Sequence, residues 1–405
     1  TEKVSCRVLR EKKQFSEAET VEVLKESVER VRPACGYYET CGGCSLQHVS
    51  PAAQVALKQR ILEEQLERIG RVRPEQILPP IYGSVWHYRD RARLSVSVDK
   101  KGRLKMGFQA KKTNEVVDIE TCQVLPKHIS DVLPMVKLLL QTLTDGGAAV
   151  RFVEFFNSRA LVVLNICFIK KPSGYSLKQI EAWFDKISGG VKQVWQVWFQ
   201  YGREPSTVLY PKDLPELKYG LPEFSVEMPY QPGDFTQINA DLNAVMISRA
   251  LRLLDIQPND RVVDLFCGLG NFSLPMAKSG ASVTGIEGLD SLVLRARQNA
   301  LRNSCVKYAS FEVADLFETD EQTVASWGVF DKMLLDPPRS GAYAVVKSLH
   351  TPYLPKRIVY VSCNPSTFAR DAEVLVNKGY NFKSAGIMNM FAQTSHVESI
   401  GVFEL

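Results

Sequence analysis

The stretch VVDLFCGLGNFSLPMA, residues 262–277, decides the fold. Its β-branched start predicts a buried strand, Gly268 and Gly270 predict a turn, and a helical pattern follows. The same alternation of short apolar strands and helical segments continues toward the C-terminus. Unbroken hydrophobicity in such strands is typical of a parallel sheet that helices cover on both faces. We therefore expect a doubly wound, mostly parallel α/β sheet, with further strands in ASVTGIEG (281–288), DKMLLDPP (331–338) and RIVYVSC (357–363).

The glycine loop predicts a ligand site, because glycines let a ligand approach the backbone at the carboxyl edge of such a sheet. Glu287 follows about 20 residues later, where an acidic side chain accepts hydrogen bonds from ribose hydroxyls. This spacing also fits a nicotinamide dinucleotide, but the third glycine that belongs beside a pyrophosphate is missing. A nucleoside without phosphates is therefore favoured, and S-adenosylmethionine is that ligand in the methyltransferase version of this fold. A purely structural turn is the weaker explanation, because Asp264 and Glu287 occur together.

Length and composition set the broad class. A chain of 405 residues predicts two or three domains, and 45% hydrophobic with 23% charged residues is ordinary for a globular protein. No run approaches the ~18 apolar residues of a membrane-spanning helix, and no signal peptide is recognisable, so we expect a cytoplasmic protein. Nine cysteines, unevenly placed, argue for a reducing compartment with some thiols kept for ligation or chemistry rather than for a disulfide framework.

Three parts are expected along the chain. Residues 1–34 alternate valine with polar residues, which predicts a partial N-terminal β module whose start looks cut into. Residues 35–234 have an α+β pattern, and residues 235–405 form the doubly wound part. The segment 51–70 predicts a helix that packs either on its sequence neighbours or on the doubly wound part. Its apolar residues at helical spacing are Val55, Ile61, Leu62, Leu66 and Ile69.

Positive charge is concentrated in residues 87–113, where nine Lys or Arg stand against two Asp, a local charge of +7 in a chain of +5. In RARLSVSV (91–98) apolar and polar residues alternate, and Lys101-Gly102 follow, so a hairpin with one core face and one basic face is predicted. Such a patch is usually a solvated face. This asymmetry, however, favours a polyanion as partner.

A second turn at the sheet edge is LLDPPRSG, residues 334–341. The two prolines after Asp336 predict a rigid turn where ligands bind in open α/β sheets. Methyltransferases that act on amino groups carry an aromatic residue after such an Asn/Asp-Pro-Pro sequence, where it stacks on the base. Arg339 occupies that position here, which argues against chemistry on an exocyclic amine.

Four cysteines predict a metal centre. Cys35, Cys41 and Cys44 follow a C-x5-C-x2-C spacing, and Cys122 lies after a predicted strand. Four thiolates suit either an iron–sulfur cluster or structural zinc, and radical enzymes that use S-adenosylmethionine have a different spacing. Unligated thiols are the alternative. The remaining cysteines, apart from Cys363, are interpreted as structural.

Cys363 ends the strand 357–362 beside an Asn-Pro turn. A buried small side chain is the usual role of such a cysteine. A thiolate at this edge could instead add to C6 of uracil, which makes C5 nucleophilic enough to accept a methyl group. A base must then remove the C5 proton. The candidate is Glu398, which enters the last predicted strand and reaches Cys363 if the two strand ends share one sheet edge.

Six ordered motifs resemble those of the RNA uracil-C5 methyltransferases: DFTQINA, DLFCGLGNF, GIEG, LLDPPRSG, IVYVSCNPSTFARD and MFAQTSHVES. The cysteine segment and YRDRARL are similar to the iron–sulfur branch that modifies 23S ribosomal RNA. The resemblance implies a Rossmann-like class I methyltransferase domain, a central α+β domain with a [4Fe-4S] cluster, and a remnant of an N-terminal RNA-binding β-barrel.

The resemblance also implies roles for individual residues. Cys363 would be the nucleophile and Glu398 the base, with the cluster on Cys35, Cys41, Cys44 and Cys122. Residues implied to contact S-adenosylmethionine are Gln237, Phe266, Asn271, Glu287, Asp315 and Asp336.

The predicted function is methylation of C5 of an unpaired or flipped uridine in 23S ribosomal RNA by a monomeric enzyme. Arg89, Arg91 and Arg93 are the hypothesised phosphate contacts. Three alternatives remain: a transfer-RNA uracil methyltransferase, whose branch typically lacks the cysteine cluster; a cytosine-C5 methyltransferase, which usually has a second catalytic cysteine in a Pro-Cys turn; and an RNA-binding or redox-sensing iron–sulfur protein with an inactive methyltransferase domain.

Overall fold

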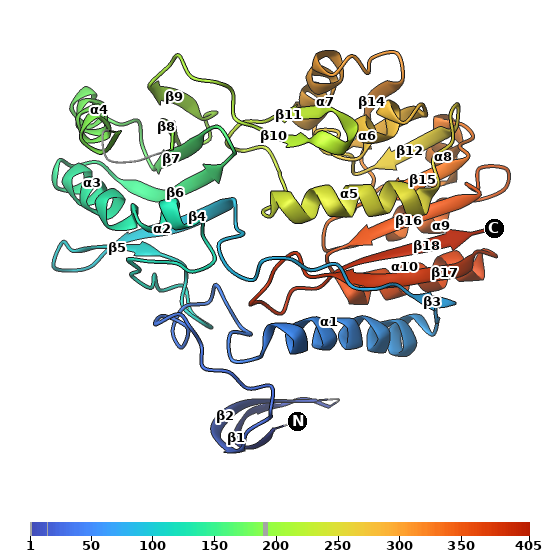
Figure 1. Cartoon of the computed structure of the whole chain (residues 1–405), viewed down its shortest axis with the longest axis horizontal. Coiled ribbons are helices and arrows are strands. Elements are labelled where there is room, and N and C mark those ends of the chain that lie inside the picture. The colour runs from blue at the N-terminus through green and yellow to red at the C-terminus, as the bar shows by residue number, and fades with distance from the viewer. Residues whose placement is uncertain (1, 14, 189–192) are drawn as a thin grey trace.

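The largest sheet has eight strands in the order β14–β13–β12–β15–β16–β18–β17–β3 (Figure 1). The computed structural model describes residues 2–13, 15–188 and 193–405. Strands β12 to β16 are parallel, and β18 runs antiparallel between β16 and β17. The strand bounds are β12 Arg261–Leu265, β13 Ser282–Glu287, β14 Ala309–Val313, β15 Lys332–Leu335, β16 Arg357–Ser362, β17 Asn381–Met388, β18 Glu398–Glu404 and β3 Gln76–Ile77.

Helices cover both faces of this sheet, because successive strand residues point to opposite sides. Val262 belongs to a core with α5, α6 and α7, whereas its neighbour Val263 belongs to a core with α8, α9 and α10. The predicted doubly wound α/β fold is confirmed, with an antiparallel end that the prediction did not specify. The helix bounds are α5 Ala240–Leu254, α6 Ser273–Lys278, α7 Asp290–Arg302, α8 Glu321–Trp327, α9 Tyr343–Ser348 and α10 Pro365–Asn377.

A second sheet has six strands in the order β5–β4–β6–β7–β8–β9. One face packs on two helices, and Leu94 is fully buried there, while Arg93 lies on the opposite face. The predicted hairpin is formed by β4 and β5. The bounds are β4 Arg91–Val98, β5 Leu104–Gly107, β6 Val150–Asn157, β7 Val162–Phe168, β8 Trp195–Tyr201, β9 Thr207–Tyr210, α2 Lys127–Ser130, α3 Leu133–Asp145 and α4 Gly174–Ser188.

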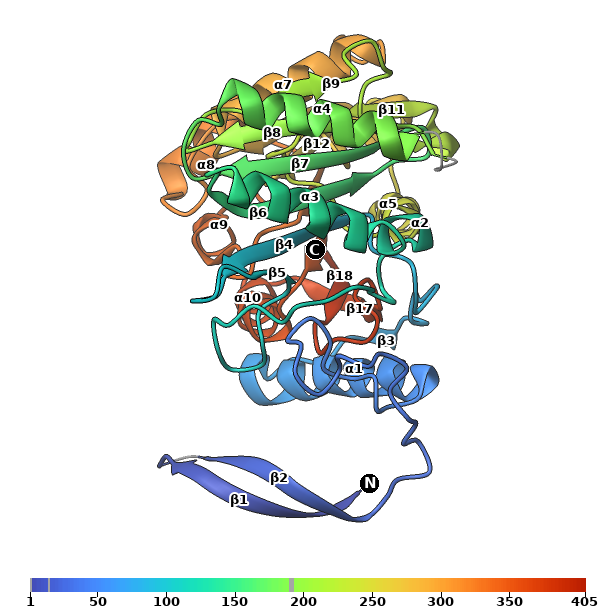
Figure 2. The same cartoon turned by 90° about the vertical axis from the view of Figure 1, so that its left-hand side faces the viewer.

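The predicted helix over 51–70 is α1, Pro51–Gln65, followed by a π-helical turn, Leu66–Gly70. The Ser50 hydroxyl accepts from the Ala53 amide at 3.3 Å and so caps its start. The helix packs on β17 of the large sheet and on α10, one of the helices that cover that sheet (Figures 1 and 2). Leu62 and Leu66 are buried as expected, but Ile61 and Ile69 are exposed. The helical spacing of apolar residues predicted the helix correctly but part of its buried face wrongly. Two of the buried residues of α1, Gln54 and Lys58, are polar.

The N-terminal residues form one hairpin, β1 Lys3–Glu11 and β2 Ser16–Lys25, that projects beyond the rest of the molecule (Figure 2). A smaller hairpin, β10 Lys218–Leu221 and β11 Val226–Pro229 with the 3₁₀ turn Pro222–Phe224 between them, connects the two sheets. Among the described residues, no helix is long and apolar enough to cross a membrane.

Candidate active site and cysteine cavity

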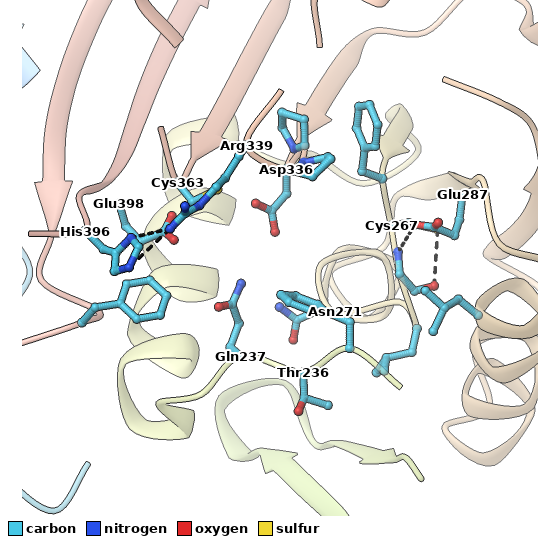
Figure 3. A pocket seen from close by; sticks show the side chains of 18 of the residues that line it. Thr236, Gln237, Cys267, Asn271, Glu287, Asp336, Arg339, Cys363, His396 and Glu398 are labelled. Carbon is cyan, nitrogen blue, oxygen red and sulfur yellow. Dashed lines mark hydrogen bonds between the residues drawn. The ribbon is translucent and has the colours of Figure 1, made fainter. Parts of the chain in front are cut away.

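A cavity of about 910 Å³ opens at the carboxyl ends of β12, β13, β15 and β16. Figure 3 shows Cys363, Arg339, His396 and Glu398 on one side of it and Glu287 with Cys267 on the other, with Asp336 between them. All eight predicted catalytic and cofactor residues line this cavity, although they come from positions 237 to 398: Gln237, Phe266, Asn271, Glu287, Asp315, Asp336, Cys363 and Glu398.

The glycine loop is held in place by Glu287. The Gly268 amide donates to Oε2 of Glu287 at 3.2 Å, and the Leu289 amide donates to Oε1 at 3.1 Å. Gly268 and Gly270 have φ values of 56° and 93°, in the left-handed region that favours glycine. Phe266 packs against Phe317 with ring centroids 5.6 Å apart. The loop therefore presents backbone, one carboxylate and an aromatic surface, which suits a nucleoside.

Asn271 is fixed by two side chains that the sequence did not single out. The Tyr219 hydroxyl donates to Oδ1 of Asn271 at 2.8 Å, and Asn243 exchanges hydrogen bonds with the same amide at 3.0 and 3.1 Å. Tyr219 lies on the small β10–β11 hairpin, which no motif marks. Its partner is 52 residues away in the chain, so no local pattern could have revealed the contact.

Two carboxyl groups lie beside the loop, Asp264 fully buried and Asp336 half-buried. Burial raises the pKa of Asp336 to about 7, and burial together with the charge of Asp336 raises the pKa of Asp264 to about 7. Oδ2 of Asp264 accepts a hydrogen bond from the Ser273 hydroxyl, while its Oδ1 has no partner within the described part of the chain. Asp315 receives the amide of Phe317 at 2.9 Å and lines the same cavity.

The pairing of β16 with β18 brings Cys363 and Glu398 to one sheet edge. Ser362, just before Cys363, pairs with Ser399, just after Glu398. Burial, followed by the charges of Glu398 and Asp336, raises the pKa of Cys363 to about 12, and Arg339 opposes this rise. Burial and then Asp336 raise the pKa of Glu398 well above its usual value, while Arg339 and Lys58 lower it. In the free protein the thiol is therefore protonated near neutral pH, and the surroundings of Glu398 shift it in the same direction.

Arg339 joins the two strand ends. Its Nη2 donates to Nδ1 of His396 at 2.6 Å, which requires an unprotonated ring nitrogen, and burial and Arg339 lower the pKa of that imidazole. Its carbonyl accepts from Nδ2 of Asn364 at 2.9 Å. The Asn364 side chain also caps α10 by accepting from the Ser366 amide at 3.1 Å. The Asn-Pro turn thus fixes both Cys363 and the Asp-Pro-Pro turn.

The four predicted metal-binding cysteines line a second cavity, of about 230 Å³: Cys35, Cys41, Cys44 and Cys122. Burial raises the pKa of Cys41 and of Cys44, and that of Cys122 to about 11. Across the described ranges, no three His, Cys, Asp or Glu side chains are close enough to hold a single metal ion. A set of four thiols around one cavity is the donor type that iron–sulfur clusters use.

The two cavities share four wall residues, namely Gly42, Gly43, Arg89 and His396. Arg89 is thus the one member of the predicted arginine set that reaches either cavity. Arg93 donates to Glu154 at 2.9 and 3.0 Å, and Arg91, mostly buried, donates to the carbonyl of Asp234 at 2.8 Å.

The glycine loop and Glu287, at the edge of a doubly wound sheet, define a class I S-adenosylmethionine-dependent methyltransferase fold. The family model for tRNA (Uracil-5-)-methyltransferase matches residues 52–404. The chain belongs to this family, the RNA uracil-C5 methyltransferases.

Two relatives agree with this assignment, and a solved structure has a similar fold. The chain is 62% identical to the 23S rRNA (uracil(1939)-C(5))-methyltransferase RlmD of Neisseria lactamica, covering 100% of this chain and 89% of that protein. It is 47% identical to the enzyme of the same name from Chromobacterium violaceum, covering 100% and 79%. The fold is similar to that of Pyrococcus abyssi tRNA (uracil-54, C5)-methyltransferase in complex with S-adenosyl-L-homocysteine, with a TM-score of 0.69, 24% identity, and coverage of 98% and 91%.

Proposed function

We propose that the protein methylates C5 of a specific uridine in 23S ribosomal RNA with S-adenosylmethionine as methyl donor. The observation that supports this reaction is the position of Cys363 beside Glu398 in the cavity that the glycine loop also lines. The names of the relatives at 62% and 47% identity support the choice of RNA. Such a substrate implies a cytoplasmic enzyme, and nothing in the mechanism requires more than one copy of the chain.

In the proposed reaction, Cys363 adds to C6 of uracil as a thiolate, and the electron pair of the C5–C6 double bond moves toward O4. Arg339 favours this step, because its positive charge lowers the pKa of the thiol. The sulfonium cofactor, when bound, supplies the methyl group that C5 accepts. Glu398 then takes the C5 proton, the C5–C6 double bond re-forms, and the C6–S electron pair returns to Cys363.

The residues that would hold the cofactor lie on the other side of the cavity. Glu287 would accept hydrogen bonds from the ribose hydroxyls. The amides of Gly268 and Leu289 donate to its carboxylate and so hold it at the glycine loop. Phe266 offers a ring face for the adenine, and Asn271 and Gln237 offer amides. Asp336 and Asp315 add acidic groups that would favour a cationic ligand.

We further propose that Cys35, Cys41, Cys44 and Cys122 hold a [4Fe-4S] cluster with a structural role. Four protein ligands leave no iron open for chemistry. We keep the predicted domain division as part of this proposal: a partial β-barrel at 1–34, a central domain at 35–234 and a methyltransferase domain at 235–405. Two elements of the middle segment, α1 and β3, pack on the large sheet of the last domain.

For RNA binding, Arg89 is the strongest candidate for a phosphate contact, because it reaches the wall shared by both cavities. Arg91 and Arg93 keep partners within the protein, so their phosphate role would require these bonds to rearrange. The target uridine must be unpaired or flipped to enter the cavity.

The experiment that tests this function is incubation of the protein with labelled S-adenosylmethionine and unmodified ribosomal RNA, followed by mapping of 5-methyluridine. We expect one modified uridine in 23S RNA, and none with Cys363→Ala. Transfer RNA is included as a competing substrate. Methylation of transfer RNA alone would overturn the ribosomal assignment, and no methylation of either RNA would favour a binding protein.

A further inference from the structure

The buried side of α1 is polar, which is unusual for a helix that packs on a sheet. Gln54 and Lys58 lie one turn apart on the same face, and both are 0% exposed. They face the loop 389–397 between β17 and β18. This loop carries Phe391 and His396, which line the large cavity, and it leads directly into Glu398.

Gln54 holds the middle of that loop. Its Nε2 donates to Oε1 of Gln393 at 3.0 Å, and its Oε1 accepts from the Gln393 amide at 2.9 Å. The carbonyl of Gln393 in turn accepts from the amides of Ser45 and Leu46, both at 2.9 Å. The loop is therefore fixed from two sides by residues more than 300 positions earlier in the chain.

Lys58 holds the start of the loop with a buried ammonium group. Its Nζ donates to Oδ1 of Asn389 at 2.7 Å and to the carbonyl of Phe391 at 2.8 Å. Both acceptors are neutral, and within the described ranges no carboxylate lies within 4.0 Å of Nζ. A buried cation without an ion pair is costly, so a purely structural position would be better filled by an apolar or amide side chain.

We propose that Lys58 is a positioning residue for the proton-removing step: its buried positive charge keeps Glu398 available as a base, and its two hydrogen bonds fix the turn from which β18 starts. This inference rests on the proposed function of Glu398. The charged and titratable groups that face Glu398 are Asp336 after β15, Arg339 beyond it, Cys363 after β16, Lys58 on α1 and the neighbouring His396.

The direction of the effect follows from these charges. Asp336 raises the pKa of Glu398, and Arg339 and Lys58 lower it. Loss of Lys58 would raise it further, so that a smaller fraction of Glu398 is ionised at a given pH. Burial lowers the pKa of Lys58 itself to about 8, so its charge disappears above that pH. The part of the difference between wild type and a neutral variant that comes from the charge should therefore be present below about pH 8 and disappear above it.

The test separates the two covalent steps. Lys58→Met removes the charge and keeps an apolar stem, and Lys58→Gln is a second neutral variant that keeps a donor. With RNA that carries 5-fluorouridine at the target, no C5 proton is present, so the rate of covalent attachment to Cys363 reports only the first step. With ordinary RNA in single turnover, release of 5-methyluridine from the adduct reports proton removal by Glu398.

We expect attachment to 5-fluorouridine RNA to stay within about twofold of wild type in either Lys58 variant. Release at pH 7 should slow about tenfold for each unit by which the pKa of Glu398 rises, with methylated adduct accumulating on a denaturing gel. Above pH 9 the charge-dependent part of this slowing should disappear, and only a pH-independent part from the lost hydrogen bonds should remain.

Gln54→Met is the matched control, since it removes loop hydrogen bonds but no charge. We expect it to slow release by a similar factor at every pH. The inference is overturned if the Lys58 variants behave as Gln54→Met does, or if attachment and release slow equally. Absence of 5-methyluridine with wild type would instead overturn the proposed function, so the two failures are distinguishable.

Discussion

At the scale of single residues, the proposed chemistry needs two side chains that act in turn on one uracil. Cys363 adds to C6, and Glu398 later removes the proton from C5. Glu398 is buried and Cys363 is half-buried at the edge of the sheet, and desolvation together with neighbouring carboxylates raises the pKa of each. Neither residue is activated by itself in the free protein. The order of addition and proton removal therefore depends on the cationic groups around them.

Replacement of Glu398 by Gln tests the base. The amide has nearly the same shape but cannot take the C5 proton, so the methylated adduct should form and fail to resolve. We expect a covalent protein–RNA complex on a denaturing gel and a loss of about 10²–10⁴-fold in 5-methyluridine formation. A variant that releases product at the wild-type rate would contradict the assignment.

Replacement of Arg339 by Met tests the thiol. Burial holds the pKa of Cys363 near 12, and Arg339 keeps it from rising further. Alkylation by iodoacetamide, which needs the thiolate, should therefore increase with pH in wild type and be slower in Arg339→Met at every pH below 12. Mass spectrometry of the Cys363 peptide follows the reaction. Equal or faster alkylation in the variant would show that Arg339 does not act on this thiol.

At the scale of elements, the close contact of α10 with the π-helical turn that follows α1 depends on one glycine. A Cβ on Gly70 would lie 2.3 Å from the carbonyl oxygen of Ala369, a backbone atom that cannot move alone. We expect Gly70→Ala to reduce the free energy of unfolding by about 1–3 kcal/mol in urea titration. Gly174→Ala is the control, because nothing lies within 4 Å of its added Cβ. Equal stability of the two variants would contradict this packing.

The elements themselves were largely predictable from local patterns. Short apolar runs, glycine turns and Pro51 with Gly70 marked the strands and helices of the large sheet and α1. The buried face of α1 was not predictable. Gln54 and Lys58 look like solvent-facing residues in any helical pattern, and their partners lie more than 300 residues away. Burial of polar side chains is set by tertiary contacts, which local periodicity does not contain.

The candidate site shows the same division. Two kinds of motif residue could be found from the sequence: glycines in a turn between strand and helix, such as Gly268, and an acidic residue at the end of the next strand, Glu287. Supporting residues such as Tyr219 and Asn243 could not, because an ordinary tyrosine in a short strand carries no signal of its partner. The arginine set was found by charge alone, which cannot distinguish Arg89 at the cavity from Arg93 paired with Glu154.

At the scale of the whole molecule, the cysteine cavity and the methyltransferase cavity share a wall formed by Gly42, Gly43, Arg89 and His396. None of the four cysteines proposed as cluster ligands lines the cavity of the glycine loop. We therefore expect Cys122→Ser to lose iron and visible absorbance and to make residues 35–47 sensitive to protease, with S-adenosylmethionine affinity kept within about threefold of wild type by calorimetry.

Cys6→Ser is the matched control for that variant, since Cys6 is exposed on the N-terminal hairpin and should leave all three properties unchanged. Retention of full iron content in Cys122→Ser would remove Cys122 from the cluster. A large loss of cofactor affinity would mean that the two cavities are coupled more tightly than their shared wall suggests.

The proposed reaction depends on one bond, between Sγ of Cys363 and C6 of the target uracil. The most direct measurement is mass spectrometry of the peptide that remains linked to 5-fluorouridine RNA after incubation with S-adenosylmethionine. We predict a single linked peptide that contains residues 358–371, with the nucleotide on Cys363 and no linkage in Cys363→Ala. A linkage on another residue, or full 5-methyluridine formation by Cys363→Ala, would contradict the account.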